Sequence, residues 1–186
     1  MGVMNLSSMN ITDNDMSLVI EKVFGKRKTK CTGFILRDNN LTSVGVKMFV
    51  DALTETRVKL KYLNLSNNSN VGDQGIEYLV NLFKKSRSIT FLALSNTGMT
   101  DRSVRLLADL LCDVDADSTC PPLEKLYLSF NEFITDDSME ALLQILHQNR
   151  TLQVLSVQYC HLSEGVRRIL REAGTKKKKK KFSLSH

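Results

Sequence analysis

Acidic side chains in one segment of the sequence are the first candidates for chemistry. Asp113, Asp115 and Asp117 alternate along the chain, and Glu124 follows eleven residues after Asp113. This spacing matches positions 1, 3, 5 and 12 of a calcium-binding loop, in which carboxylate oxygens ligate the ion. The sixth position of such a loop needs glycine for a sharp turn, but Ser118 stands there. We therefore predict a solvent-exposed insertion loop over residues 113–122 and no metal site.

Nucleophilic, acid–base and redox catalysis find little support in the sequence. The three histidines, His147, His161 and His186, are not joined to a serine or cysteine nucleophile by any known motif, and no glycine-rich phosphate-binding motif occurs. The four cysteines form no C-x-x-C pair, which argues against a zinc or redox site; they are Cys31, Cys112, Cys120 and Cys160. The sequence thus predicts a protein that is not an enzyme and that uses no cofactor.

A regular spacing of apolar residues runs through most of the chain. In its clearest copy, Leu60, Leu63 and Leu65 precede Asn68, which gives the pattern L-x-x-L-x-L-x-x-N. About six copies start near residues 1, 31, 60, 89, 123 and 152. A near-constant period between about 20 and 50 residues is typical of a solenoid of stacked units. The last position is filled by Asn, Thr or Cys, namely Asn39, Asn68, Thr97, Asn131 and Cys160.

The pattern resembles the leucine-rich repeat family, in particular its ribonuclease-inhibitor-like subclass. The resemblance implies an α/β solenoid with a curved parallel sheet on the concave side and helices on the convex side. We expect one leucine-rich repeat domain over residues 1–174. Apolar residues at helical spacing follow each strand signal, and they predict helices over 13–23, 42–56, 73–86, 101–113, 136–148 and 163–172. Asp73, Asp101 and Asp136 fall at the helix starts, where a carboxylate can cap backbone N–H groups.

Aromatic residues fall at the outward positions of the predicted strands. Because side chains alternate across a strand, the two Leu of L-x-L point into the core and their neighbours point to the concave face. This places Tyr62 and Phe91 side by side, with Lys125 next and Tyr127 one step along. Such a row is typical of a protein interface, although the rings could instead pack on one another to cover a bare sheet. The predicted partner-binding residues are Arg37, Tyr62, Phe91, Lys125, Tyr127, Phe130 and Tyr159.

The excess positive charge of the chain is concentrated near its end. Subtracting one run of six lysines from the 26 basic residues leaves 20, which equals the 20 acidic residues, although the whole chain carries a net charge of +6. We predict that residues 175–186 form a lysine-rich, disordered tail. The tail could contact an acidic partner, whether protein, nucleic acid or anionic membrane, or act as a nuclear import signal or a solubilising segment. Its candidate residues are Lys176, Lys177, Lys178, Lys179, Lys180 and Lys181.

These features favour a non-catalytic scaffold or adaptor that binds a protein partner through the concave sheet. The resemblance also admits a regulator of an enzyme, of the GTPase-activating or inhibitor type, or a cytoskeletal or ciliary component. The sequence has no secretory signal pattern and no apolar run of about 18 residues that would predict a transmembrane segment. We therefore predict an intracellular protein in the cytoplasm, in the nucleus or associated with the cytoskeleton.

Overall fold

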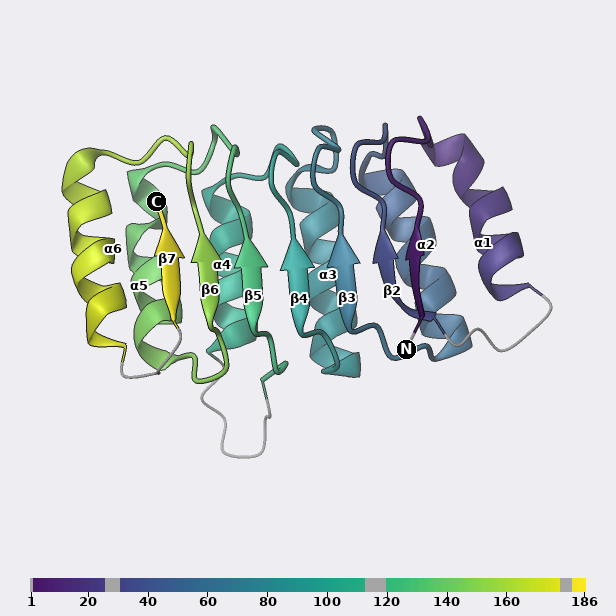
Figure 1. Cartoon of the computed structure of the whole chain (residues 1–186). Coiled ribbons are helices and arrows are strands. Elements are labelled where there is room, and N and C mark those ends of the chain that lie inside the picture. The colour runs from purple at the N-terminus through teal and green to yellow at the C-terminus, as the bar shows by residue number, and fades with distance from the viewer. Residues whose placement is uncertain (1, 26–30, 113–119, 178–181) are drawn as a thin grey trace.

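The described part of the chain forms one open sheet covered by helices on a single side (Figure 1). The structure, a computed structural model, describes residues 2–25, 31–112, 120–177 and 182–186. Most of the predicted insertion loop, including Asp113, Asp115 and Asp117, and four of the six lysines of the run lie outside the described residues. Among the described residues, no helix is long and apolar enough to cross a membrane.

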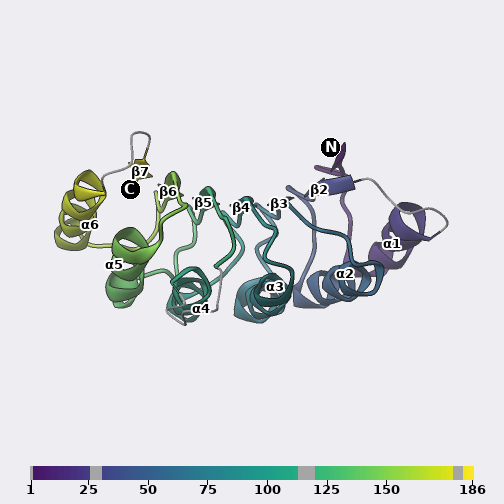
Figure 2. The same ribbon diagram turned by 90° about the horizontal axis from the view of Figure 1, so that it is seen from below.

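Seven parallel strands make up the sheet, and they pair in sequence order from one end to the other. Figure 2 shows the strands along the inner side of a shallow arc and the helices along its outer side. The strands are β1 (Gly2–Asn5), β2 (Cys31–Ile35), β3 (Tyr62–Asn64), β4 (Phe91–Ala93), β5 (Lys125–Tyr127), β6 (Val154–Ser156) and β7 (Ser183–Ser185). The helices are α1 (Met16–Phe24), α2 (Ser43–Thr56), α3 (Gly72–Ser86), α4 (Asp101–Leu111), α5 (Met139–Gln148) and α6 (Glu164–Lys176), with 3₁₀ turns at Asp13–Asp15 and Asp136–Ser138. The predicted α/β solenoid is therefore confirmed.

The core is built from the leucines that the repeat predicted to face inward. Leu63, Leu92 and Leu126 occupy equivalent positions in the register of adjacent strands, and all three are buried. Each helix buries one apolar stripe against the sheet, as helix α3 does with Ile76 and Leu79. Because every unit leaves its two sides apolar, neighbouring units must stack to bury them, and one continuous core results.

The asparagine that ends the repeat motif bonds backbone groups of two neighbouring units. The Asn68 side-chain amide donates to the Leu36 carbonyl at 3.0 Å and to the Leu65 carbonyl at 2.8 Å, and it accepts from the Leu41 N–H at 3.0 Å. One amide supplies both donors and an acceptor, so a single residue can satisfy three backbone groups inside the core. Asn68 thus joins the backbone of its own repeat to that of the repeat before it.

The predicted capping by the aspartates at the helix starts is wrong, because each of them instead accepts hydrogen bonds from the next repeat. Thr100, not Asp101, caps helix α4, and its hydroxyl accepts from the Arg102 N–H. Asp73 accepts from the Thr100 N–H at 2.9 Å, from its hydroxyl at 2.7 Å, and from the Ser103 hydroxyl. Burial works against ionisation of Asp73, but the hydrogen bonds from Ser103 and Thr100 outweigh it and hold its pKa below the ordinary value. The carboxylates thus join consecutive helices.

Three aspartates whose pKa values are lowered by folding predict a loss of stability in acid. The pKa values of Asp38, Asp73 and Asp136 are lowered in the folded chain. Their contribution is therefore complete above the unfolded value of about 3.9 and is lost as the pH falls through the folded values. We expect the melting temperature to fall steeply below about pH 4 and to change little between about pH 5 and pH 7. In Asp73→Asn, which keeps an acceptor but cannot titrate, the fall should be smaller. A melting temperature that rises on acidification would contradict this assignment.

The end of the chain differs from the predicted disordered tail. Thr175 and Lys176 continue helix α6, and β7 pairs with β6 in parallel, with Leu184 beside Leu155. Phe182 and Leu184 pack against the core. The Lys177 ammonium donates to the Ile145 carbonyl at 3.3 Å and lies 4.9 Å from the centre of the Phe182 ring. The prediction of disorder is wrong for these residues. The edge of β6 supplies backbone hydrogen-bond partners, so a short segment with one inward-facing Leu can form a strand there.

Candidate protein-binding surface

The predicted row of aromatic side chains lies across the middle of the sheet. The strand register aligns Gly33, Tyr62, Phe91 and Lys125, as expected from the spacing of the repeats. The Tyr62 and Phe91 rings are stacked, with centroids 4.0 Å apart and planes at 11°. Lys125 is exposed at the next position in the same line. The sequence therefore predicted correctly which side chains of neighbouring strands lie together.

Tyr127 extends this row diagonally. Its ring lies 5.4 Å from that of Phe91 at an interplanar angle of 40°, and its backbone pairs with that of the small residue Ala93. Tyr62, Phe91 and Tyr127 are all half-buried, because each ring covers part of its neighbour and leaves one side open. Burial raises the pKa of Tyr62, so its hydroxyl stays protonated at neutral pH. The rings thus cover bare sheet and still present an apolar outer surface.

A second aromatic pair lies at the edge where the strands end. The Phe130 and Tyr159 rings are stacked, with centroids 4.5 Å apart and planes at 18°, and the two residues are 53 % and 68 % exposed. Both have positive φ values, 61° and 56°, which are unusual for bulky residues. The equivalent positions of earlier repeats carry Asp38, Asn67 and Asn96, residue types that tolerate this conformation better. The turn of the repeat thus holds two bulky, exposed residues in a backbone conformation that they do not favour.

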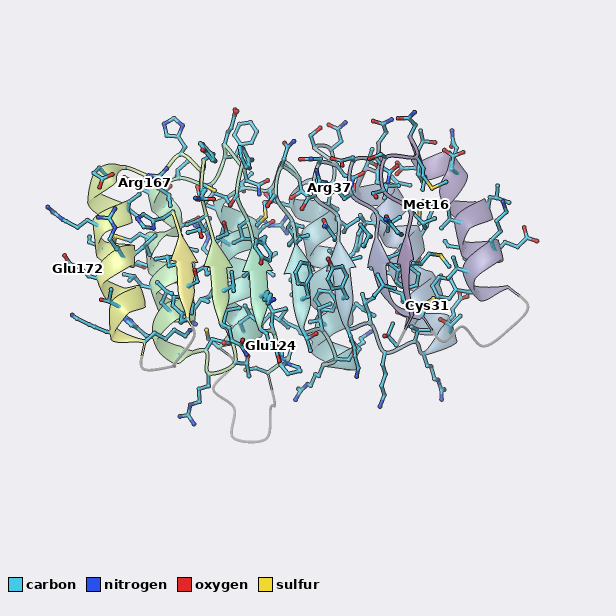
Figure 3. The ribbon with its side chains drawn as sticks, in the orientation of Figure 1. Met16, Cys31, Arg37, Glu124, Arg167 and Glu172 are labelled. Carbon is cyan, nitrogen blue, oxygen red and sulfur yellow. The ribbon has the colours of Figure 1, made fainter. Side chains whose placement is uncertain are left out.

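The other half of the same edge is polar and internally bonded. The Arg37 guanidinium donates to Asp38 at 2.8 Å, and the Asn67 amide donates to the other oxygen of that carboxylate at 2.5 Å. The Asn96 amide donates to the Asn67 side-chain oxygen at 3.2 Å, and this bond extends the series of hydrogen bonds into the next repeat. The Asn67 hydrogen bond lowers the pKa of Asp38. Figure 3 shows Arg37 at this edge and Glu124 at the opposite edge.

One exposed aromatic residue, Phe133, was not predicted from the sequence. Phe133 is 64 % exposed in the segment that follows Phe130, between β5 and the 3₁₀ turn before helix α5. It lies outside the strand pattern, so alternation along the strands could not identify it. The signal that could have found it is its apolar type in the segment F-N-E-F, where the other repeats carry small or polar residues.

The described residues provide no arrangement suited to metal binding or nucleophilic catalysis. Within them, no three His, Cys, Asp or Glu side chains lie close enough to hold a metal ion. Burial raises the pKa of Cys112 and Cys160 to about 11, so both remain protonated thiols at neutral pH. A protonated, buried thiol is a poor nucleophile.

The strands of the repeats form one parallel sheet, helices cover one side of it, and buried asparagines join neighbouring repeats. These features define a solenoid of leucine-rich repeats. The chain is a member of the leucine-rich repeat family. The family model described as Leucine Rich repeat matches residues 58–80 and 119–143. These two segments contain β3 and β5 and the first turns of the elements that follow them.

Two characterised proteins are similar to this chain over most of its length. Ribonuclease inhibitor from Sus scrofa is 30 % identical over 139 residues, which is 75 % of this chain and 29 % of that protein. Human NACHT, LRR and PYD domains-containing protein 14 is 28 % identical over 158 residues, which is 72 % of this chain and 14 % of that protein. The chain thus spans less than a third of each relative, and the similarity to ribonuclease inhibitor agrees with the predicted subclass.

Proposed function

We propose that this protein binds another protein through its concave sheet and the edge where the strands end. We name the five aromatic side chains that carry this proposal the aromatic surface; they are Tyr62, Phe91, Tyr127, Phe130 and Tyr159. The exposed Phe130–Tyr159 stack is the observation that supports it most strongly. No catalytic step is part of the proposed function.

The chemistry of this surface suits a partner with an apolar protrusion. Aromatic rings bring large contact areas with few rotatable bonds, so ordering them on binding costs little entropy. The stacks hold the rings in place before the partner arrives. Lys125 pairs with Phe91 in the strand register, and Arg37 lies at the edge where the strands end. Charges beside an apolar contact affect association rate and orientation more than affinity.

Removing the exposed stack should weaken partner binding. The partner can be captured from cell extract with the tagged chain and its affinity then measured with purified protein. We expect Phe130→Ala and Tyr159→Ala each to weaken binding by about 1–2 kcal/mol or more, as interface anchors do. Val44→Ala is the matched control, because Val44 is 57 % exposed on helix α2 of the convex side. Unchanged affinity in both aromatic variants would exclude the Phe130–Tyr159 stack from the binding site.

We further propose that the lysine run contributes an electrostatic contact to an acidic region of the partner. In the same binding assay, replacing Lys178, Lys179, Lys180 and Lys181 by Gln should lower the association rate and its dependence on salt. Exposed charges act at long range and are screened by salt, whereas aromatic anchors mainly slow dissociation. An unchanged salt dependence would assign these lysines to solubility alone.

Inhibition of an enzyme is a second candidate function. The similarity to ribonuclease inhibitor favours it over the other regulatory roles. The direct assay measures ribonuclease A activity with increasing amounts of the chain. Inhibition that Tyr159→Ala relieves would identify the partner as a ribonuclease, and no inhibition at any ratio would exclude this enzyme as the partner.

A further inference from the structure

The N-terminal end of the solenoid has an open apolar groove between β1 and α1. The groove encloses about 500 Å³. The apolar side chains that line it include Met4 and Leu6 from the strand side and Leu18 and Val19 from the helix. Leu18 is 53 % exposed. Figure 1 shows α1 as the outermost helix at this end of the row. The end of the core is thus open to solvent along the described residues.

The opposite end of the solenoid is closed. There β7 adds a last strand to the sheet, and Phe182 and Leu184 cover the core beneath helix α6. β1 and β7 are the two edge strands of the described sheet, so each keeps unpaired backbone groups on its outer edge, and β1 also has the apolar groove beside it. An unpaired edge beside an apolar groove is a place where another chain adds. The open groove, rather than the unpaired edge, therefore distinguishes the N-terminal end from the end that Phe182 and Leu184 cover.

The charges around this groove identify a second copy of the chain as that partner. Asp15, Leu18, Val19 and Lys22 all line the groove, and their spacing places them on one face of helix α1. The two apolar residues therefore have an acidic residue on one side and a basic residue on the other. When an identical helix lies antiparallel across Leu18 and Val19, Lys22 of each copy meets Asp15 of the other. The pattern is self-complementary about a two-fold axis.

Both charges are available for such a contact. Thr12 donates from its N–H and its hydroxyl to one Asp15 oxygen, Oδ2, at 2.8 and 2.7 Å, while no hydrogen bond to Oδ1 is found within the described segments. Lys22 is exposed, and the described residues provide no carboxylate within ion-pair distance of it. The hydrogen bonds from Thr12 also lower the pKa of Asp15, which keeps it ionised at neutral pH.

We propose that two copies of this chain associate end to end through their N-terminal grooves. The two α1 helices lie antiparallel, Leu18 and Val19 form the apolar centre, and two Asp15–Lys22 pairs flank it. The unpaired edges of the two β1 strands lie beside this contact. Because the same patch is used on both copies, the assembly closes at two and leaves both aromatic surfaces open.

Sedimentation equilibrium of the 186-residue chain over a wide concentration range tests the proposal. We expect a monomer–dimer equilibrium that stops at twice the mass of one chain. Leu18→Glu should raise the dimer dissociation constant by at least about tenfold, because a charge enters the apolar centre twice. Lys22→Glu should also raise it, because like charges then face each other. Adding Asp15→Asn to Lys22→Glu removes that repulsion, keeps an acceptor for Thr12, and should recover part of the affinity.

Ile169→Glu is the matched control at the other end of the solenoid. Ile169 is exposed on helix α6, so the same new charge should leave the dimer unchanged. A monomer at every concentration would overturn the proposal, as would a dimer that Leu18→Glu does not weaken. Larger assemblies that Ile169→Glu disrupts would show head-to-tail stacking and would also overturn it. Partner binding through the aromatic surface is measured separately and does not depend on these outcomes.

Discussion

Leu94→Ala is expected to lower the free energy of unfolding by roughly 2–5 kcal/mol, the range observed when a fully buried leucine is truncated. Leu94 is 0 % exposed and follows β4 in the middle of the solenoid. Its N–H donates to the Tyr127 carbonyl of the next repeat at 2.8 Å. Repeats stack on both sides, so the surrounding core cannot collapse into the space that the missing side chain leaves.

Urea denaturation of the purified chain measures this loss. Val44→Ala is the control, because Val44 is 57 % exposed on helix α2 and its truncation should change stability by only about 0.5 kcal/mol. A loss of less than about 1 kcal/mol for Leu94→Ala would mean that this leucine does not face the core, and the strand register would be wrong.

Asn131→Ala should destabilise the chain by roughly 2–4 kcal/mol, because several buried backbone groups lose their hydrogen-bond partner at once. The Asn131 amide donates to the carbonyls of Leu94 and Leu128 at 2.9 and 2.8 Å. Its side-chain oxygen accepts from the backbone N–H groups of Thr97 and Gly98 at 2.9 and 3.1 Å. Water cannot replace these bonds without opening the stack between two repeats.

A natural threonine at the equivalent position of another repeat suggests a milder substitution for Asn131. Thr97 holds the equivalent position one repeat earlier, and its hydroxyl donates to the Leu94 carbonyl at 2.8 Å. Asn131→Thr should therefore keep one bond, to Leu128, and lose less stability than Asn131→Ala in the same denaturation experiment. Equal and small losses in both variants would show that Asn131 does not join the two repeats.

The alternation of side chains along each strand made the core and the aromatic row predictable from the sequence. A strand residue faces one side or the other, so the L-x-L pattern determined that Leu63 and Leu92 are buried. The constant repeat length then placed equivalent residues of neighbouring strands in register, which brought Tyr62 beside Phe91. Both results depend only on local geometry repeated at a fixed interval.

Contacts between repeats were less predictable, because they depend on how neighbouring repeats stack and not on the local sequence alone. Asp73 was expected to cap its own helix, but the stacking of units brings the Thr100 N–H within its reach. The Phe130–Tyr159 stack depends on a left-handed backbone conformation at both residues, which the bulky residue types do not favour by themselves.

The two ends of the solenoid depend most on the tertiary structure. The segment that contains Leu184 follows a run of lysines and has too few apolar residues to predict a strand, yet the free edge of β6 supplies the backbone partners that it needs. In the first repeat, Leu18 and Val19 belong to an ordinary amphipathic helix, and only the packing of α1 beside β1 shows that both line a groove. The sequence by itself determined the repeated unit and its inward face, whereas the tertiary structure decided the arrangement around β1 and β7, because local patterns do not specify which edges and grooves the stacking leaves open.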